Sequence, residues 1–239
     1  QVHFIGHLQT NKVKQVVGKT ALIHSVDSQR LLQAIENQAA KLGVVQDILL
    51  EVNIAGEESK GGCMPQEVEA LARQAMDMSA VRLRGLMAIP PVSAQPGANK
   101  PYFAAMRQLF VDIKGKMAHN QDDMDCLSMG MSGDYADAIA EGSTLVRVPF
   151  SRLSYVEVNG KHLYFHLADG TVREVAGSLK DYEPLLLVRP EFMRIHRSYI
   201  VNMLQIDELS PAGVHTFSGM NLPVSRLLYP QLQKDYMKL

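Results

Sequence analysis

Cysteine is scarce in this chain, and its scarcity excludes two classes of protein. Only Cys63 and Cys126 occur, far apart and outside any C-x-x-C spacing. A small scaffold held by disulfide bonds does not fit this pattern, and neither does a zinc site built from cysteine ligands. A reducing cytoplasm is the compartment that the cysteine content indicates.

The chain also lacks a strong charge of either sign and a long apolar run. Its formal net charge is −1, so any DNA contact must come from a local basic patch and not from a global positive field. No apolar run approaches the length of a membrane span, and His3–Lys14 is too polar for a signal peptide. Hydrophobic residues make up 46% of the chain, which is ample for packed cores.

Strand-like and helical segments alternate before residue 148. The strand candidates are 2–5, 21–26, 48–53, 81–87, 124–129 and 144–148. The helix candidates are 11–17, 29–42, 66–78, 102–117 and 134–141. Ser28 is suited to cap the helix at 29–42, and Gly43 to end it. The alternation predicts an α/β fold with parallel strands joined by right-handed crossovers.

After residue 148 the apolar period changes to two, which predicts a mainly β unit. Strands at 154–158 and 161–167 flank Asn159-Gly160, a pair typical of a type I′ hairpin turn. The other candidates are strands at 171–175, 204–209, 214–217 and 221–224 and helices at 178–186 and 227–237. No linker rich in Pro, Gly or Ser intervenes, so we expect two abruptly joined domains, 1–148 and 149–239.

Four segments of the first domain resemble the pyridoxal-phosphate homeostasis proteins. They are HFIGHLQTNK (3–12), LLEVNIAGEESKGG (49–62), LRGLMAIPP (83–91) and LSMGMSGDYADAIAEGSTLVRV (127–148). The resemblance implies a (β/α)8 barrel of the alanine-racemase type, a pyridoxal-phosphate cofactor, a cytoplasmic bacterial setting and no established turnover. Because the sequence offers six of the eight strands, we expect an incomplete barrel.

Functional groups of such a barrel lie at the carboxyl ends of its strands. Asn53, Met87 and the loop from Ser128 to Ser132 occupy this position, and the loop offers hydroxyls and backbone N–H groups to a phosphate. By resemblance, Arg147 faces the pyridine nitrogen and keeps it unprotonated. The alternatives are that Ser128 and Ser132 are turn and cap residues, and that Arg147 forms an ion pair.

The lysine that anchors the cofactor in this family is expected upstream of Gln1, and Lys12 and Lys60 match other motif positions. The sequence after Arg147 reads PFS, where the resemblance leads us to expect the rest of a phosphate cup. We therefore expect no covalent cofactor chemistry and no enzyme activity. The histidines of this domain match no metal-ligand spacing, so we predict no metal site and place them at the surface: His3, His7 and His24.

The second domain carries the sharpest motif, FMRIHRSYIVN (192–202). With PFSRLSYVEVNGKHLYFHLADG (149–170), SLKDYEPLL (178–186) and LPVSR (222–226), it resembles the LytTR DNA-binding domain of transcription regulators, response regulators among them. The resemblance implies a β domain whose loops enter successive major grooves of double-stranded DNA. It also implies tandem half-sites, and with them a homodimer.

The motif assigns base reading to three loops, through Lys161, Arg197 and Arg226, with His162 as the alternative to Lys161. Arginine paired with guanine is the commonest base contact. The hydroxyls of Ser198 and Ser225 suit phosphate oxygens. Arg189, Arg194 and His196 complete a local positive cluster, and Asn202 is expected to close a turn in the core.

Three hypotheses remain open for the whole chain. It is a DNA-binding regulator behind a non-catalytic barrel remnant, or a cofactor-binding homeostasis protein with a DNA-binding tail. The third hypothesis is an unnatural fusion with no integrated function, which the abrupt join and the missing barrel parts favour.

Overall fold

The computed structural model describes residues 2–57, 59–93, 95, 97–117, 123–131, 133–147 and 149–239. It divides into two compact units, Gln1–Arg147 and Val148–Leu239, and each is described by itself. Within the described ranges, no helix combines the length and the apolar character that crossing a bilayer requires.

The first unit is built on a five-stranded parallel sheet in the order β1-β2-β3-β4-β5. The strands are β1 (His3–Phe4), β2 (Leu22–Val26), β3 (Gln46–Glu51), β4 (Val81–Met87) and β5 (Cys126–Ser128). Spatial order equals chain order, so each crossover adds a strand on the same side, as in a barrel. Of the predicted strand at 144–148, the described residues 144–147 form one isolated bridge, between Leu145 and Ser128, and residue 148 lies outside the described residues.

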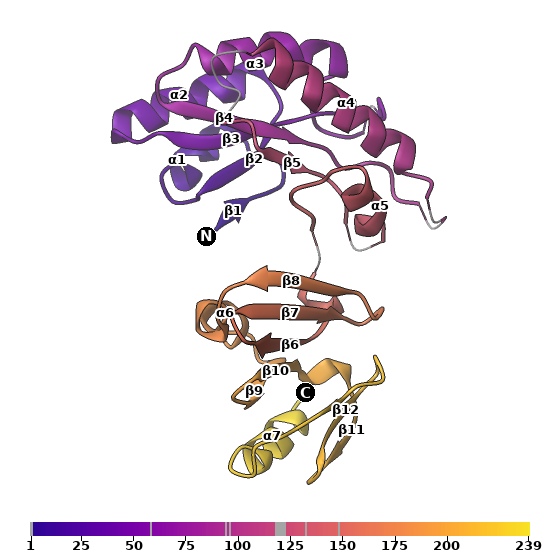
Figure 1. The fold of residues 1–239 in the computed structure, drawn as a ribbon. Helices are drawn as coiled ribbons and strands as arrows, with labels where there is room; N and C mark the ends of the chain where they lie inside the picture. The colour runs from indigo at the N-terminus through magenta and orange to yellow at the C-terminus, as the bar shows by residue number, and fades with distance from the viewer. Residues whose placement is uncertain are drawn as a thin grey trace. The chain divides into compact units, whose positions relative to one another are not determined.

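Helices connect these strands, and Figure 1 shows α2, α3 and α4 over one face of the sheet. They are α1 (Val13–Val16), α2 (Gln29–Leu42), α3 (Val68–Met76), α4 (Lys100–Lys116) and α5 (Tyr135–Ala140), with 3-10 turns at Thr10–Lys12 and Pro65–Glu67. The predicted ends of α2 are confirmed: the Ser28 hydroxyl accepts from Leu31 N–H, and Gly43 adopts φ +67°.

The described residues of this unit form a larger and a smaller apolar cluster. The larger one packs the inner sides of the helices against the sheet, with Ile23, Ile48 and Phe103 fully buried. The smaller consists of Leu22, Leu49 and Met87. Because neighbouring residues of a strand face opposite sides, Leu22 and Leu49 face away from Ile23 and Ile48. The smaller cluster is therefore the lining of the half-barrel's interior.

The second unit contains a five-stranded antiparallel sheet in the order β8-β7-β6-β10-β9. Its strands are β6 (Leu153–Asn159), β7 (His162–Leu167), β8 (Val172–Ala176), β9 (Phe192–His196) and β10 (Tyr199–Asn202). The 3-10 turn Phe150–Arg152 leads into it. Helix α6 (Leu179–Leu186) follows β8, and Ser178 and Asp181 form its capping box.

A smaller antiparallel sheet completes this unit, in the order β11-β12-β13. Its strands are β11 (Ile206–Ser210), β12 (Gly213–Thr216) and β13 (Asn221–Leu222), with a 3-10 turn at Met203–Gln205 before them and α7 (Tyr229–Tyr236) after them. Tyr155 and Ile195 of the larger sheet share one buried core with Val214, Leu222 and Leu232. Both sheets and α7 thus form one body.

Candidate functional sites

In the first unit, Asn53 lies just beyond β3, at the edge where the parallel strands end. It is 9% exposed, and both ends of its amide are used locally. Its Oδ1 accepts from Glu57 N–H at 3.1 Å, and its Nδ2 donates to Glu57 O at 2.8 Å. Asn53 therefore closes its own loop, and both the oxygen and the nitrogen of its side-chain amide are already bonded within the protein.

Met87 ends β4 and serves packing. It is 1% exposed and contacts Leu22 and Leu49 in the half-barrel's interior. A thioether fills irregular apolar space well.

Ser128 ends β5 and belongs to a hydrogen-bonded row of side chains. Its Oγ lies 3.0 Å from His24 Nδ1, and His24 Nε2 lies 3.0 Å from His3 Nδ1. Burial, together with the charges of His3 and Arg147, lowers the pKa of His24 to about 4, so this ring is neutral at pH 7. His24 is 2% exposed, so the expectation of a surface histidine is wrong. The sequence signal for this buried position is that His3 and His24 lie on neighbouring strands and face the same barrel interior.

The loop after Ser128 is satisfied by the protein's own groups. Asp134 accepts from Met131 N–H at 2.7 Å through Oδ1, and from Asn99 Nδ2 at 2.6 Å through Oδ2. Gly130 has φ +93°, and a Cβ there would lie 2.5 Å from Ala138 Cβ. A carboxylate thus already holds one of the N–H groups expected to cradle a phosphate. Ser132, also expected in this site, lies outside the described residues.

Arg147 is half-buried, and its backbone N–H donates to Gly130 O at 3.0 Å. Burial lowers its pKa, whereas the Glu51 carboxylate opposes that shift. Burial and the nearby Asp27 raise the pKa of Glu51. Within the described residues, no lysine lies on the five strands of the sheet. The described residues therefore offer a cation and a hydroxyl for an anionic ligand but no strand amine for a covalent bond.

In the second unit, two backbone hydrogen bonds bring three loops to one end of the larger sheet. Val158 N–H donates to Ser198 O at 2.9 Å, which joins the β6–β7 turn to the β9–β10 turn. Ser225 N–H donates to Ile195 O at 2.8 Å, which joins the loop after β13 to β9. The basic side chains of Lys161, Arg197 and Arg226 lie on these loops and are exposed. The structure thus brings together the three residues that the motif assigns to base reading.

The β6–β7 turn differs from the predicted type I′ turn. Asn159 pairs with His162, so the two central residues are Gly160 and Lys161. Gly160 has φ +63°, and Asn159 does not have a positive φ. A glycine with positive φ at the first central position is the pattern of a type II′ turn. Lys161 therefore lies in the turn itself, and His162 begins β7 and contacts Glu174 at 2.7 Å.

The β9–β10 turn is held by Arg194, whose side chain faces the protein. Its guanidinium forms an ion pair with Glu183 of α6 and donates to Arg197 O at 2.9 Å and to His196 O at 3.3 Å. His196 Nδ1 accepts from Ser198 N–H at 3.2 Å. A neutral His196 therefore carries its proton on Nε2.

Arg189 and Asn202 have structural contacts. The Arg189 guanidinium lies 4.2 Å from the centre of the Phe150 ring. Asn202 is fully buried, donates to Leu153 O at 2.8 Å and accepts from Leu204 N–H at 3.1 Å. The expectation that Asn202 closes a turn in the core is confirmed.

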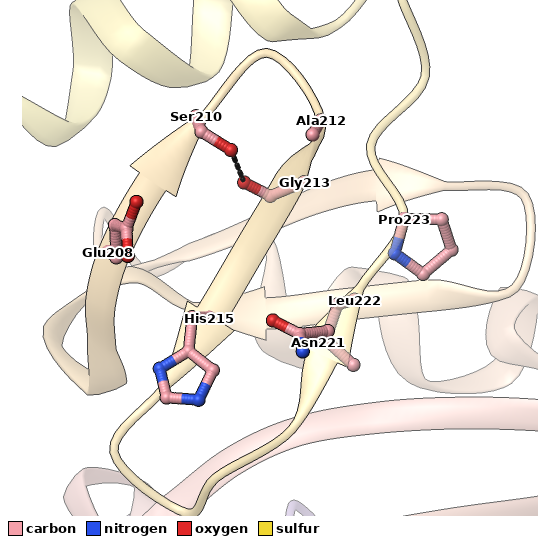
Figure 2. Close-up of a pocket in the computed structure, with 8 residues that line it drawn as sticks. All are labelled: Glu208, Ser210, Ala212, Gly213, His215, Asn221, Leu222 and Pro223. Atoms are coloured by element: carbon pink, nitrogen blue, oxygen red, sulfur yellow. Dashed lines mark hydrogen bonds between the residues drawn. The ribbon is translucent and has the colours of Figure 1, made fainter.

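A hollow on the small sheet has a different character. Figure 2 shows its lining, in which Glu208 comes from β11, His215 from β12 and Asn221 from β13. Glu208 is exposed, and His215 Nδ1 lies 3.1 Å from the Asp207 carboxylate. These carboxylates would repel phosphates, so the basic loops and not this hollow are the candidate nucleic-acid surface.

Comparison with family models assigns both units. The model of the alanine racemase N-terminal domain matches residues 1–148. The chain belongs to this family. The model of the LytTr DNA-binding domain matches residues 143–237. The second unit is therefore a LytTr-type domain that follows an alanine-racemase-type half-barrel in the chain.

Two curated relatives of the alanine-racemase-type unit are pyridoxal phosphate homeostasis proteins. The pyridoxal phosphate homeostasis protein of Aquifex aeolicus is 44% identical over 146 residues, which cover 61% of this chain and 63% of that protein. The protein of that name from Pseudomonas aeruginosa is 39% identical, covering 61% and 60%. The chain thus spans about three fifths of the length of these relatives.

A solved structure agrees with this assignment. PipY of Synechococcus elongatus, determined without PLP, is 33% identical and has a TM-score of 0.56, covering 61% of this chain and 67% of that one. PipY has also been solved with PLP bound, and that structure has a TM-score of 0.54 at 31% identity, covering 61% and 66%.

Proposed function

We propose that this chain is a transcription regulator that binds double-stranded DNA sequence-specifically through its LytTr-type unit. The carrying observation is the convergence of three exposed basic side chains, from Lys161, Arg197 and Arg226, at one end of one sheet. The net charge of −1 makes this local cluster the source of attraction to phosphates.

The residues of these loops then take two roles, base reading and phosphate contact. Arg197 and Arg226 read guanine edges in the major groove, and Lys161 reads a third position. Ser198, Ser225 and the Nε2–H of His196 donate to phosphate oxygens and fix the register of the domain on the duplex. Repetition of such a site in tandem would bring two copies together as a homodimer on DNA.

The test is a selection of bound sequences from random duplexes at one fixed salt concentration. Wild-type protein should enrich a motif, and the same selection with Arg226→Ala should lose preference at part of that motif, at a cost of about 1–3 kcal/mol for the bidentate contact. Lys238→Ala, near the C-terminus, is the matched loss of one positive charge and should keep the motif. Folded protein that enriches no motif would refute sequence-specific binding.

For the half-barrel unit we propose a non-catalytic role without a covalent cofactor. Three observations support this: the strands carry no lysine in the described residues, the Asn53 amide is used in its own loop, and Asp134 holds Met131 N–H. Noncovalent pyridoxal phosphate, held through Arg147 and Ser128, is the second candidate, favoured by the PLP-bound structure of PipY. An unnatural fusion would leave DNA binding intact if the LytTr-type unit folds by itself.

A further inference from the structure

We infer that Arg194 positions the β9–β10 turn for base reading and does not itself contact DNA. This assignment rests on the proposed function, because it concerns the turn that presents Arg197. The Arg194 guanidinium has three protein partners: the Glu183 carboxylate, Arg197 O at 2.9 Å and His196 O at 3.3 Å. A phosphate would have to compete with a carboxylate for the same cation.

The geometry of the hairpin explains why the turn needs this support. The register between β9 and β10 shifts between Tyr199 and Ile200, because Tyr199 pairs with His196 whereas Ile200 pairs with Arg194. This bulge leaves Ile195 without a partner on β10, and its carbonyl oxygen accepts from Ser225 N–H instead. Arg197 lies in the turn itself, so its carbonyl oxygen is outside the ladder and needs another donor. The carbonyl oxygens of His196 and Arg197 are the groups that Arg194 satisfies.

The choice of arginine fits this bridging position. A planar guanidinium presents donors in several fixed directions, so it can reach a carboxylate and two carbonyl oxygens together, whereas the three donors of an ammonium all lie on one nitrogen. Glu183 lies on α6, so the ion pair anchors the turn to a helix outside the hairpin. The backbone of Arg197 is held while its side chain remains exposed.

Direct contact and positioning predict different results for one substitution. If Arg194 served as a phosphate contact, Glu183→Gln would release its guanidinium and remove a negative charge, so affinity for all duplexes would rise. If Arg194 positions the turn, Glu183→Gln loosens the turn, and the preference for the selected motif over a scrambled duplex falls. A lower preference supports positioning, whereas higher affinity with an unchanged preference supports a phosphate contact.

The experiment measures affinity of the whole chain for the selected motif and for a scrambled duplex over a series of salt concentrations. Arg194→Ala should lower the ratio of the two affinities on the order of tenfold, as expected for one lost base contact, and leave the salt slope on the scrambled duplex unchanged. Arg194→Lys should fail to restore the ratio. The double variant with Arg197→Ala should be no worse than Arg197→Ala alone, because both changes remove the same contact.

Arg152→Ala is the matched control, since Arg152 forms an ion pair with Asp169 at 2.8 Å at the other end of β6. It should keep the affinity ratio.

A salt slope lower by about one in Arg194→Ala, restored by lysine, would overturn the inference and make Arg194 a phosphate contact. If Arg194→Ala does not fold, the ratio for Glu183→Gln decides. If wild-type protein enriches no motif, the proposed function itself fails, whereas loss of preference in Arg197→Ala but not in Arg194→Ala refutes only this inference.

Discussion

Val158 donates its backbone N–H to the carbonyl oxygen of Ser198 at 2.9 Å. This bond links the ends of two hairpins that are far apart in the sequence. It places the turn that contains Lys161 beside the turn that contains Arg197, so one patch of DNA can meet both.

The ambiguity between Lys161 and His162 can be resolved by substitution. Lys161 lies in the centre of the β6–β7 turn, whereas His162 contacts Glu174 of β8 at 2.7 Å. We expect Lys161→Ala to lower affinity for the selected motif and to reduce its preference over a scrambled duplex, because Lys161 is proposed to read a base. His162→Ala should change neither value much. Fluorescence anisotropy titrations with the two duplexes would measure both, and the reverse order of effects would assign the site to His162.

Pyridoxal phosphate should form no covalent bond with this chain. We expect no imine absorbance on adding the cofactor and no mass increase after borohydride reduction, because the strands carry no lysine in the described residues. Noncovalent binding through Arg147 would instead appear by calorimetry and be lost in Arg147→Ala. A borohydride-stable adduct mapped to one lysine would contradict the prediction, and a Lys60→Ala variant would test one candidate directly.

Acid should destabilise the half-barrel unit. The pKa of His24 is lowered to about 4 in the folded chain, and an unfolded histidine titrates near 6.5. Between these values the unfolded state binds a proton that the folded state does not, so the free energy of unfolding falls as pH falls through this window. One histidine contributes a slope of at most about 1.4 kcal/mol per pH unit.

Urea unfolding followed by hydrogen exchange of the β2 and β3 amides would measure this slope. His24→Gln should flatten it, whereas His7→Gln should leave it unchanged, because the His7 side chain is 70% exposed. Equal slopes in wild type and His24→Gln would show that another group controls the acid response.

Asn202→Ala should destabilise the LytTr-type unit on the order of 3 kcal/mol. The substitution removes the donor to Leu153 O and the acceptor for Leu204 N–H, and burial leaves the Leu153 carbonyl oxygen without water. Asn221→Ala, an exposed amide on β13, is the control and should stay within about 0.5 kcal/mol of wild type. Denaturation monitored by exchange of the β6 and β10 amides would compare them.

Local signals in the sequence predicted the elements that depend on neighbouring residues. Ser28 and Gly43 mark the two ends of α2 because capping is a matter of one helical turn. The Asn-Gly signal located the β6–β7 hairpin but not its turn type, because strand register decides which two residues are central. The hairpin of β9 and β10 was missing from the predicted strands, since its polar residues and its bulge interrupt the period of two.

Contacts between distant segments could not be predicted in this way. The sequence groups Arg194 with Arg197 as one basic cluster, and only the fold places Glu183 against Arg194 and leaves Arg197 exposed. Similarly, His3, His24 and Ser128 come from three strands, and their hydrogen-bonded row depends on the curvature of the sheet.

The bond between Ser225 N–H and Ile195 O has a consequence for the kind of DNA site that this unit can accept. It ties the loop that carries Arg226 to the strand that precedes Arg197, so the interval between the two arginine backbones belongs to the protein. If both arginines read bases as proposed, a duplex with one extra base pair between the two positions would present the correct bases at the wrong spacing. The unit would then select the spacing of the two base positions as well as their identity.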